Sequence, residues 1–271
     1  MIMEMERYIG VIDLCATGKT EVLYPFQRHL GIDLPIRSES EIESDSDLKN
    51  AIFSLADQTT EDLLILFVLS YAGSRKISVA LDVIGRISRS KNILTIGIFS
   101  GEVLGRNDTA IGFYNSTFLL NSSKGSSWIS DATSIIRGIS DTIVVPGLIG
   151  IDIADVKEVL HDAGETLMGT GTGRGPDRTI IAARSALRHL SIQSPNFSSA
   201  SSILVSAFDG IHANVVELDR AVQIIDAAFE NDPVIMASLI PDDQMQDNFT
   251  IKVFAGGFPH HKLRQLSGTR P

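Results

Sequence analysis

Two apolar runs on either side of an amphipathic segment constrain the fold of this chain more than any other feature. Residues 63–70 read LLILFVLS and residues 92–99 read NILTIGIF, and both runs are typical of buried strands. In residues 74–88, SRKISVALDVIGRIS, apolar side chains recur every three or four positions, which predicts a helix. A strand, a helix and a strand in this order indicate parallel pairing through a right-handed crossover, and therefore an α/β layer.

The surrounding sequence extends this pattern. Residues 8–14 predict a further buried strand, and residues 128–142 predict a helix that ends before Pro146-Gly147. Residues 104–127 break the alternation, and the cluster NSSKGSS within them is typical of a loop. The acidic, serine-rich residues 38–47 are expected to form a solvated loop that leads into another helix.

The last third of the chain has a different order of elements. Helices are expected over residues 153–163, 177–190 and 214–229, and strands over residues 166–170, 202–208, 233–240 and 248–255. Because the final two strands have no helix between them, we expect them to be antiparallel.

These elements predict an α/β protein with a Rossmann-like parallel-sheet N-terminal domain, a central helix, and a smaller α+β C-terminal domain with a mixed four-stranded sheet. The predicted boundaries are residues 1–127 for the first domain, 128–145 for the central helix, 146–258 for the second domain and 259–271 for a tail.

Charge and composition exclude several classes of protein. Asp and Glu number 33 against 23 Lys and Arg, and the net charge of −10 disfavours binding to nucleic acid or to an anionic membrane. The single cysteine, Cys15, excludes a disulfide framework, and the six histidines show no defensible metal-ligand spacing, so no metal site is predicted. No apolar run approaches the roughly 20 residues of a membrane helix. The N-terminus does not look like a signal peptide, and we expect a cytoplasmic protein.

The most glycine-rich run is GTGTG at residues 169–173. Glycine-rich loops cradle phosphates because backbone N–H groups can approach the anion, often at a helix N-terminus. The alternative is a flexible connection between a strand and a helix capped by Pro176 and Asp177.

A second candidate phosphate loop is DLCATGKT at residues 13–20. It ends like a Walker A loop with Gly18, Lys19 and Thr20. The first glycine of that motif falls on Asp13, whose carboxylate would repel phosphates.

Two acids stand three residues apart in PGLIGIDIADV, residues 146–156. Asp152 and Asp155 lie at the start of an expected helix and therefore near one face of it. They are either ordinary capping groups that complement the helix dipole, or carboxylates that orient a water or a cation for phosphoryl transfer.

A family resemblance is carried by the residues from Pro146 onward. PGLIGIDIADV, then MGTGTGRGPDR, then SSILVSAFDGIHANVVELDRAVQII follow the order of motifs in the C-terminal domain of FtsZ, the bacterial tubulin homologue. The similarity covers residues 143–257 and ends near IKVFAGGF. By this resemblance the chain is identified as a member of the tubulin/FtsZ superfamily.

The resemblance implies a GTP-binding N-terminal domain and subunits that stack head to tail into filaments. Each subunit would donate the acids of its synergy loop to the GTP of its neighbour, where they help activate the attacking water. By position these acids are Asp152 and Asp155, and the asparagine of the family's loop falls on Gly150. A heterologous interface of this kind gives open polymers.

The N-terminal half departs from the family's pattern. The GGGTGTG signature should follow residues 63–70, but the chain reads YAGSRK there and retains one glycine, Gly73. In the first loop, Asp13 brings a negative charge toward the expected phosphates. The GTGTG run aligns instead with the C-terminal domain, so we interpret it as unrelated to the signature.

The resemblance also indicates where GTP and magnesium would bind if the pocket is remodelled. The residues expected to line such a site are Thr17, Gly18, Lys19, Gly73, Ser74, Arg75 and Asp131. Asp131 is included because the family's base-reading aspartate falls on Ser130, one residue away, when counted back from Pro146.

Three hypotheses for function result. The first is a degenerate FtsZ paralogue that hydrolyses no GTP and acts by association, capping or joining the filament of an FtsZ-type partner. The second is a divergent GTPase that binds GTP through a remodelled loop and self-assembles as a homo-oligomer. The third is a structural protein that assembles without nucleotide.

Overall fold

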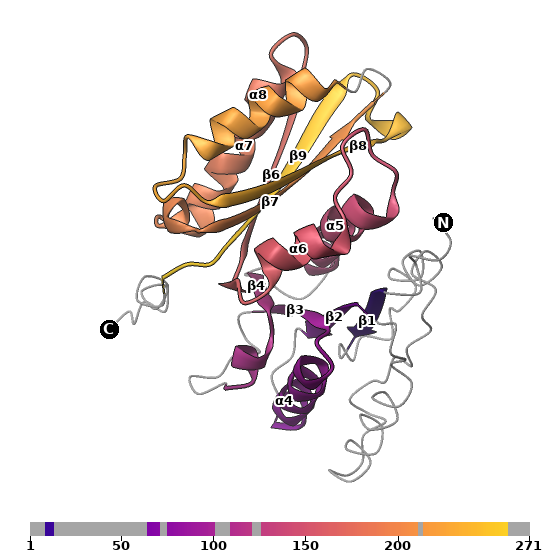
Figure 1. The fold of residues 1–271 in the computed structure, drawn as a ribbon, viewed down its shortest axis with the longest axis vertical. Coiled ribbons are helices and arrows are strands. Elements are labelled where there is room, and N and C mark those ends of the chain that lie inside the picture. The colour runs from indigo at the N-terminus through magenta and orange to yellow at the C-terminus, as the bar shows by residue number, and fades with distance from the viewer. Residues whose placement is uncertain are drawn as a thin grey trace. The chain divides into compact units, whose positions relative to one another are not determined.

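The computed structural model describes residues 9–13, 64–70, 75–100, 109–120, 126–210 and 214–259 (Figure 1). The chain divides into two compact units, residues 1–137 and 138–271. The division falls within helix α5 (Ser126–Val144).

The first unit contains a parallel sheet. Its strands β1 (Ile9–Asp13), β2 (Ile65–Ser70), β3 (Leu94–Ser100) and β4 (Ser116–Leu120) pair in sequence order. Helix α4 (Arg75–Ser90) connects β2 to β3. All residues of β2 and β3 are buried, as expected of parallel strands that are covered on both faces. The predicted α/β layer is confirmed.

Strand β4 lies within residues 104–127, where the sequence analysis found a break in the alternation and predicted no strand. The side chain of Asn115 accepts a hydrogen bond from the backbone N–H of Thr95 at 2.8 Å, and its own backbone N–H donates to the Thr95 carbonyl at 2.9 Å. Tyr114 packs edge-on against Phe99, with 5.3 Å between ring centroids. These contacts come from β3, twenty residues earlier, and a local pattern of Ser, Thr and Asn does not reveal them.

The second unit contains a mixed sheet. Its elements are α6 (Ile153–Leu160), the short strand β5 (Gly164–Glu165), β6 (Leu167–Arg174), α7 (Arg178–Gln193), β7 (Ser202–Asp209), α8 (Val215–Asp226), β8 (Val234–Pro241) and β9 (Asn248–Gly256). The strand order is β6-β9-β7-β8, with β9 antiparallel to both of its neighbours and β8 parallel to β7. The predicted mixed four-stranded sheet is confirmed.

The last two strands run in opposite directions, as expected, but they are not neighbours in the sheet. Strand β7 lies between them. In β9 the side chains of Phe249, Ile251 and Val253 are fully buried, which suits a central strand. Strand β8 is one of the two edge strands and ends at Pro241, whose missing N–H is tolerated at an edge.

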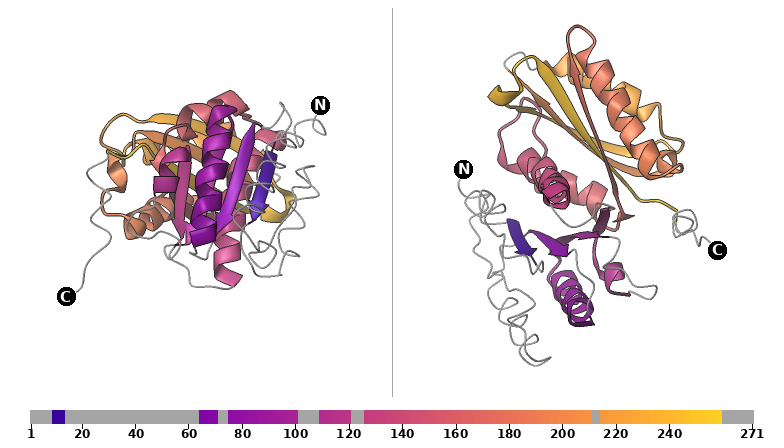
Figure 2. Two further views of the ribbon diagram at one scale, coloured as in Figure 1. Left: turned by 90° about the horizontal axis from the view of Figure 1, so that it is seen from below. Right: turned by 180° about the vertical axis from the view of Figure 1, so that it is seen from behind.

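Helices cover the two faces of this sheet differently. Helices α7 and α8 lie side by side on one face, and α6 lies on the other face beside β7 and β8 (Figures 1 and 2). The core between the sheet and α7 and α8 is built from small and branched side chains, including Ala182, Ala186, Leu218 and Val205. The small side chains on α7 allow a close approach to β6.

Candidate functional site

Residues 145–152, between α5 and α6, form a loop that is fixed to strand β8. The backbone N–H of Leu148 donates to the carbonyl of Leu239 at 2.9 Å, and the N–H of Leu239 donates to the carbonyl of Ile149 at 2.9 Å. A Cβ atom at Gly147 would lie 2.6 Å from the Leu239 carbonyl oxygen, so a glycine is needed at this close approach. We call this segment loop 145–152.

The end of the loop is locked to α6 by a capping box. Oδ1 of Asp152 accepts hydrogen bonds from the N–H groups of Ala154 at 2.7 Å and Asp155 at 3.0 Å. In return, Oδ2 of Asp155 accepts from the N–H of Asp152 at 2.8 Å. The two acids therefore satisfy backbone donors that a helix N-terminus otherwise leaves open, and the capping interpretation is confirmed.

The same loop also presents groups to the outside. Asp152 is exposed, Asp155 is half-buried, and the side chain of Leu148 is 58% exposed. Within the described part of the chain, Oδ2 of Asp152 and Oδ1 of Asp155 accept no hydrogen bond. Nothing lies within 4 Å of a Cβ atom placed on Gly150. An anchored backbone thus carries two carboxylates, each with one oxygen available, next to an exposed apolar side chain.

The GTGTG run is part of strand β6, and the phosphate-loop interpretation of it is wrong. Its glycines form one face of the strand, on which α7 packs. A Cβ atom at Gly171 would collide with the carbonyl oxygen of Ala182, and one at Gly169 with that of Ala186. The glycines are needed for close packing between strand and helix, and their alternation follows the period of two in a strand.

The residues predicted to bind nucleotide lie mostly outside the described residues. Among them are Thr17, Gly18, Lys19, Gly73 and Ser74. The strands that precede these two segments, β1 and β2, are parallel neighbours, and their carboxyl ends meet at the same edge of the sheet. Ligands bind at this edge in open α/β sheets. Strands β1 and β2 therefore end at the edge where a nucleotide is expected, and the predicted segments follow these strands in the sequence.

The two other predicted nucleotide contacts lie on helices. Arg75 is the first residue of α4, directly after the second predicted segment. Asp131 lies in the first half of α5 and is half-buried, while the preceding Ser130 is exposed. Both assignments remain predictions.

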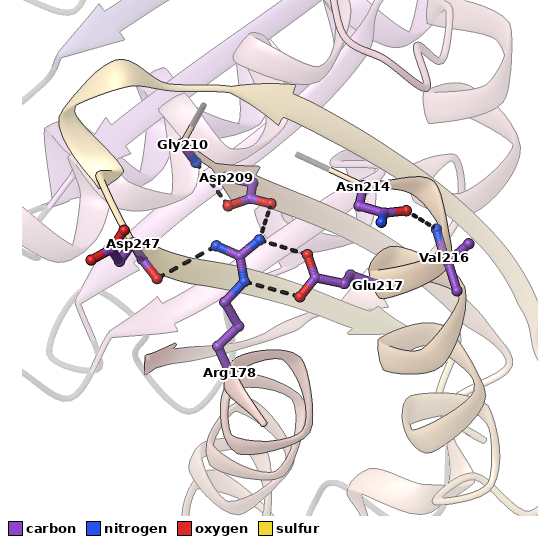
Figure 3. A network of polar contacts seen from close by, with 7 residues as sticks. All are labelled: Arg178, Asp209, Gly210, Asn214, Val216, Glu217 and Asp247. Carbon is purple, nitrogen blue, oxygen red and sulfur yellow. Dashed lines mark hydrogen bonds and ion pairs between the residues drawn. The ribbon is translucent and has the colours of Figure 1, made fainter. Parts of the chain in front are cut away.

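A buried polar cluster in the second unit was missed by sequence reasoning (Figure 3). Arg178, at the first position of α7, donates from Nε to Oε1 of Glu217 at 3.0 Å and from Nη2 to Oε2 of the same side chain. Its Nη2 also lies 2.8 Å from Oδ2 of Asp209. Nη1 donates to the backbone carbonyl of Asp247 at 3.4 Å. One guanidinium thereby joins the starts of α7 and α8, the end of β7 and the turn before β9.

Burial sets the charge properties of this cluster. Asp209 is fully buried and Arg178 is only 7% exposed. Burial raises the pKa of the Asp209 carboxyl above its ordinary value, and the Arg178 charge opposes this effect. A carboxylate placed directly after the apolar run SSILVSAF was the available sequence signal.

Across the described ranges, no group of three or more His, Cys, Asp or Glu side chains is arranged to hold a metal ion. No helix in these ranges is long and apolar enough to cross a membrane.

Comparison with known proteins supports one family. Residues 164–259 match the model of the FtsZ family, C-terminal domain. Cell division protein FtsZ of Caulobacter vibrioides is 30% identical over 131 residues, which are 48% of this chain. The match covers 26% of that relative, so it spans about a quarter of the relative's length.

Solved structures extend the similarity to the whole fold. The empty FtsZ dimer of M. jannaschii matches with a TM-score of 0.71 and 14% identity, covering 93% of this chain and 88% of that one. CetZ2 of Haloferax volcanii, solved as a GTPγS-bound protofilament, matches with a TM-score of 0.65 and 14% identity, covering 95% of both chains. The fold of this chain, with one parallel and one mixed sheet in two compact units, is therefore similar to that of FtsZ and CetZ2. In sequence, the C-terminal part of the chain is similar to FtsZ.

Proposed function

We propose that this protein acts by association with an FtsZ-type subunit, to which it presents loop 145–152, and that it binds GTP poorly itself. The observation that carries the proposal is the geometry of Asp152 and Asp155. Their capping box fixes the backbone, while one oxygen of each carboxylate remains available. In this proposal, the available oxygens face the nucleotide of the neighbouring FtsZ-type subunit.

The chemistry of the contact follows from these available oxygens. A carboxylate that is held by its neighbouring backbone can accept a hydrogen bond from a water at little further entropic cost. The exposed Leu148 adds apolar surface beside the acids, which favours docking on a partner. The protein would therefore cap an FtsZ-type filament or join it.

Weak GTP binding by the chain itself is inferred from the edge of the parallel sheet. β1 ends at Asp13, a position that introduces negative charge where phosphates are expected. One glycine, Gly73, stands between β2 and α4, where a phosphate cradle needs several. Lost backbone donors and a misplaced carboxylate each cost a few kcal/mol, and together about four decades of affinity.

Association is tested with an FtsZ-type protein loaded with GTP. The double variant Asp152→Asn and Asp155→Asn removes both charges but keeps oxygen atoms that can cap α6. We expect binding to the partner, measured by co-sedimentation, to fall at least about tenfold in this variant, because the charge-assisted hydrogen bonds that the carboxylates accept from water and from donors of the partner are lost. Equal binding of wild type and variant would refute the proposed contact.

Nucleotide binding is tested by titrating the nucleotide-stripped protein with GTP and magnesium in a calorimeter. The proposal expects no saturable heat up to millimolar GTP. Micromolar binding would overturn it and would favour the second candidate function, a divergent self-assembling GTPase.

The second candidate is favoured by the similarity to CetZ2, which was solved as a GTPγS-bound protofilament, and to the GDP-form protofilaments of TubZ from Bacillus thuringiensis. It predicts magnesium-dependent phosphate release that rises with protein concentration, since two subunits would form each site. Phosphate release at background over a wide concentration range would exclude it.

A further inference from the structure

The exposed side of α7 carries a row of arginines that the proposed function does not use. Ile181, Arg184, Arg188 and Ile192 follow one another at spacings of three and four residues and therefore share one stripe of the helix. All four are exposed, Ile181 by 47% and Ile192 by 72%. We call these four residues the arginine row.

The row is positively charged within an acidic protein. Helix α7 contains no acidic residue, whereas the whole chain has a net charge of −10. Among the described residues, neither Arg184 nor Arg188 forms an ion pair or a side-chain hydrogen bond. His189, beside the row, accepts a hydrogen bond from the backbone N–H of Thr170 on β6 at 3.2 Å. The two guanidinium groups are thus available to a partner.

The opposite charge pattern occurs in the chain itself. Residues 38–47 read SESEIESDSD, in which every second residue is acidic: Glu39, Glu41, Glu43, Asp45 and Asp47. Alternate residues of an extended peptide point to one side at intervals of about 6.6 Å. Residues four apart on a helix are separated by about 6 Å along its axis. Neighbouring carboxylates of such a peptide can therefore meet Arg184 and Arg188 at the same time.

We propose that the arginine row binds residues 38–47 of a second copy of this chain. The proposal goes beyond the function proposed above and is independent of loop 145–152. Charge complementarity and matched spacing determine the pairing, while Ile181 and Ile192 supply apolar surface at the two ends of the row. The contact would join copies through a surface other than the loop.

A labelled peptide of residues 36–49 tests whether the arginine row binds this segment. Its binding to the full chain is measured by fluorescence anisotropy at low and high salt. We expect the double variant Arg184→Ser and Arg188→Ser to bind at least about fivefold more weakly, and wild-type binding to fall with salt, because exposed ion pairs are screened. The matched control removes two exposed arginines of α4, Arg86→Ser and Arg89→Ser, and should bind like wild type.

A charge swap distinguishes loss of peptide binding from loss of folding. The variant Arg184→Glu and Arg188→Glu should regain binding to a peptide in which lysines replace the five acids. Equal peptide binding by wild type and the arginine-row variant, or a failed charge swap, would overturn the row as a binding surface.

Sedimentation velocity of the full chain without nucleotide tests whether the partner of the arginine row is a second copy of the chain. At low salt we expect self-association that is lost equally when the five acids are changed to serine and when Arg184 and Arg188 are changed to serine. Asp152 and Asp155 are intact in both variants, so the result is separate from the test of loop 145–152. A wild-type chain that stays monomeric although the peptide binds would overturn the second copy as the partner.

Discussion

The side chains of Asp152 and Asp155 each accept a hydrogen bond from the backbone N–H of the other residue. A carboxylate oxygen of Asp152 accepts the N–H of Asp155 at 3.0 Å, and a carboxylate oxygen of Asp155 accepts the N–H of Asp152 at 2.8 Å. This reciprocal pair makes the end of loop 145–152 and the first turn of α6 one rigid piece. The two alternatives for these acids, capping and chemistry, are therefore compatible, because capping occupies only one oxygen of each.

Substitutions of Asp152 separate its capping role from its charge. Asp152→Ala should lower the free energy of unfolding by about 1 kcal/mol, because two N–H groups of α6 lose their acceptor. Asp152→Asn should leave that free energy nearly unchanged, since asparagine caps as well as aspartate. Both values are measured by urea denaturation. Equal destabilisation by alanine and asparagine would contradict this assignment.

The glycines of β6 are expected to be intolerant of any side chain. Gly171→Ala should lower the free energy of unfolding by about 2 kcal/mol or more, because its Cβ atom collides with the Ala182 carbonyl. Gly150→Ala, where nothing lies within 4 Å of the added atom, should change it by less than about 0.5 kcal/mol. Thermal and urea unfolding of both variants provide the comparison. A stable Gly171→Ala protein would show that α7 packs less closely than described.

Loss of Arg178 should be among the most damaging substitutions in the second unit. Arg178→Met leaves the fully buried Asp209 without its cation, and removing one member of a buried ion pair costs about 3–5 kcal/mol. The matched control is Arg174→Met, whose side chain is 74% exposed and lies 3.5 Å from Asp247. This control should cost less than about 1 kcal/mol. Similar urea midpoints for the two variants would refute a structural role for the cluster.

Asp209 should also make stability depend on pH. Because burial raises its pKa in the folded protein above the ordinary value of 3.8, the folded state binds this proton more tightly than the unfolded chain. Its contribution to stability is therefore full below the ordinary pKa and is lost as pH rises through the folded pKa. Asp209→Asn removes this loss, so the stability of the variant relative to wild type should improve between pH 4 and pH 7.

Urea unfolding at several pH values within that range measures the effect. The quantity compared is the difference in free energy of unfolding between Asp209→Asn and wild type. A difference that stays constant with pH, or that moves in the opposite direction, would contradict the raised pKa.

Much of the fold could be predicted from local patterns in the sequence. The apolar runs that became β2 and β3 and the amphipathic pattern of α4 depend on residues close together in the chain. The same holds for the acids that cap α6, since a capping box spans four residues. Strand β4 could not be predicted from the local sequence, because its position depends on the pairing of Asn115 with Thr95.

The sequence by itself determined the class of fold, the order of most elements and the similarity to FtsZ. Periodicity and motif order depend only on residues that are close together or follow one another in the chain. Only the tertiary structure decided that GTGTG is a strand under α7, that β7 separates β8 from β9, and that Arg178 joins Asp209 to Glu217. Each of these depends on residues that are distant in sequence and meet only when the sheet and its helices pack. A glycine run has one composition whether it binds a phosphate or a helix, and the packed neighbour distinguishes the two.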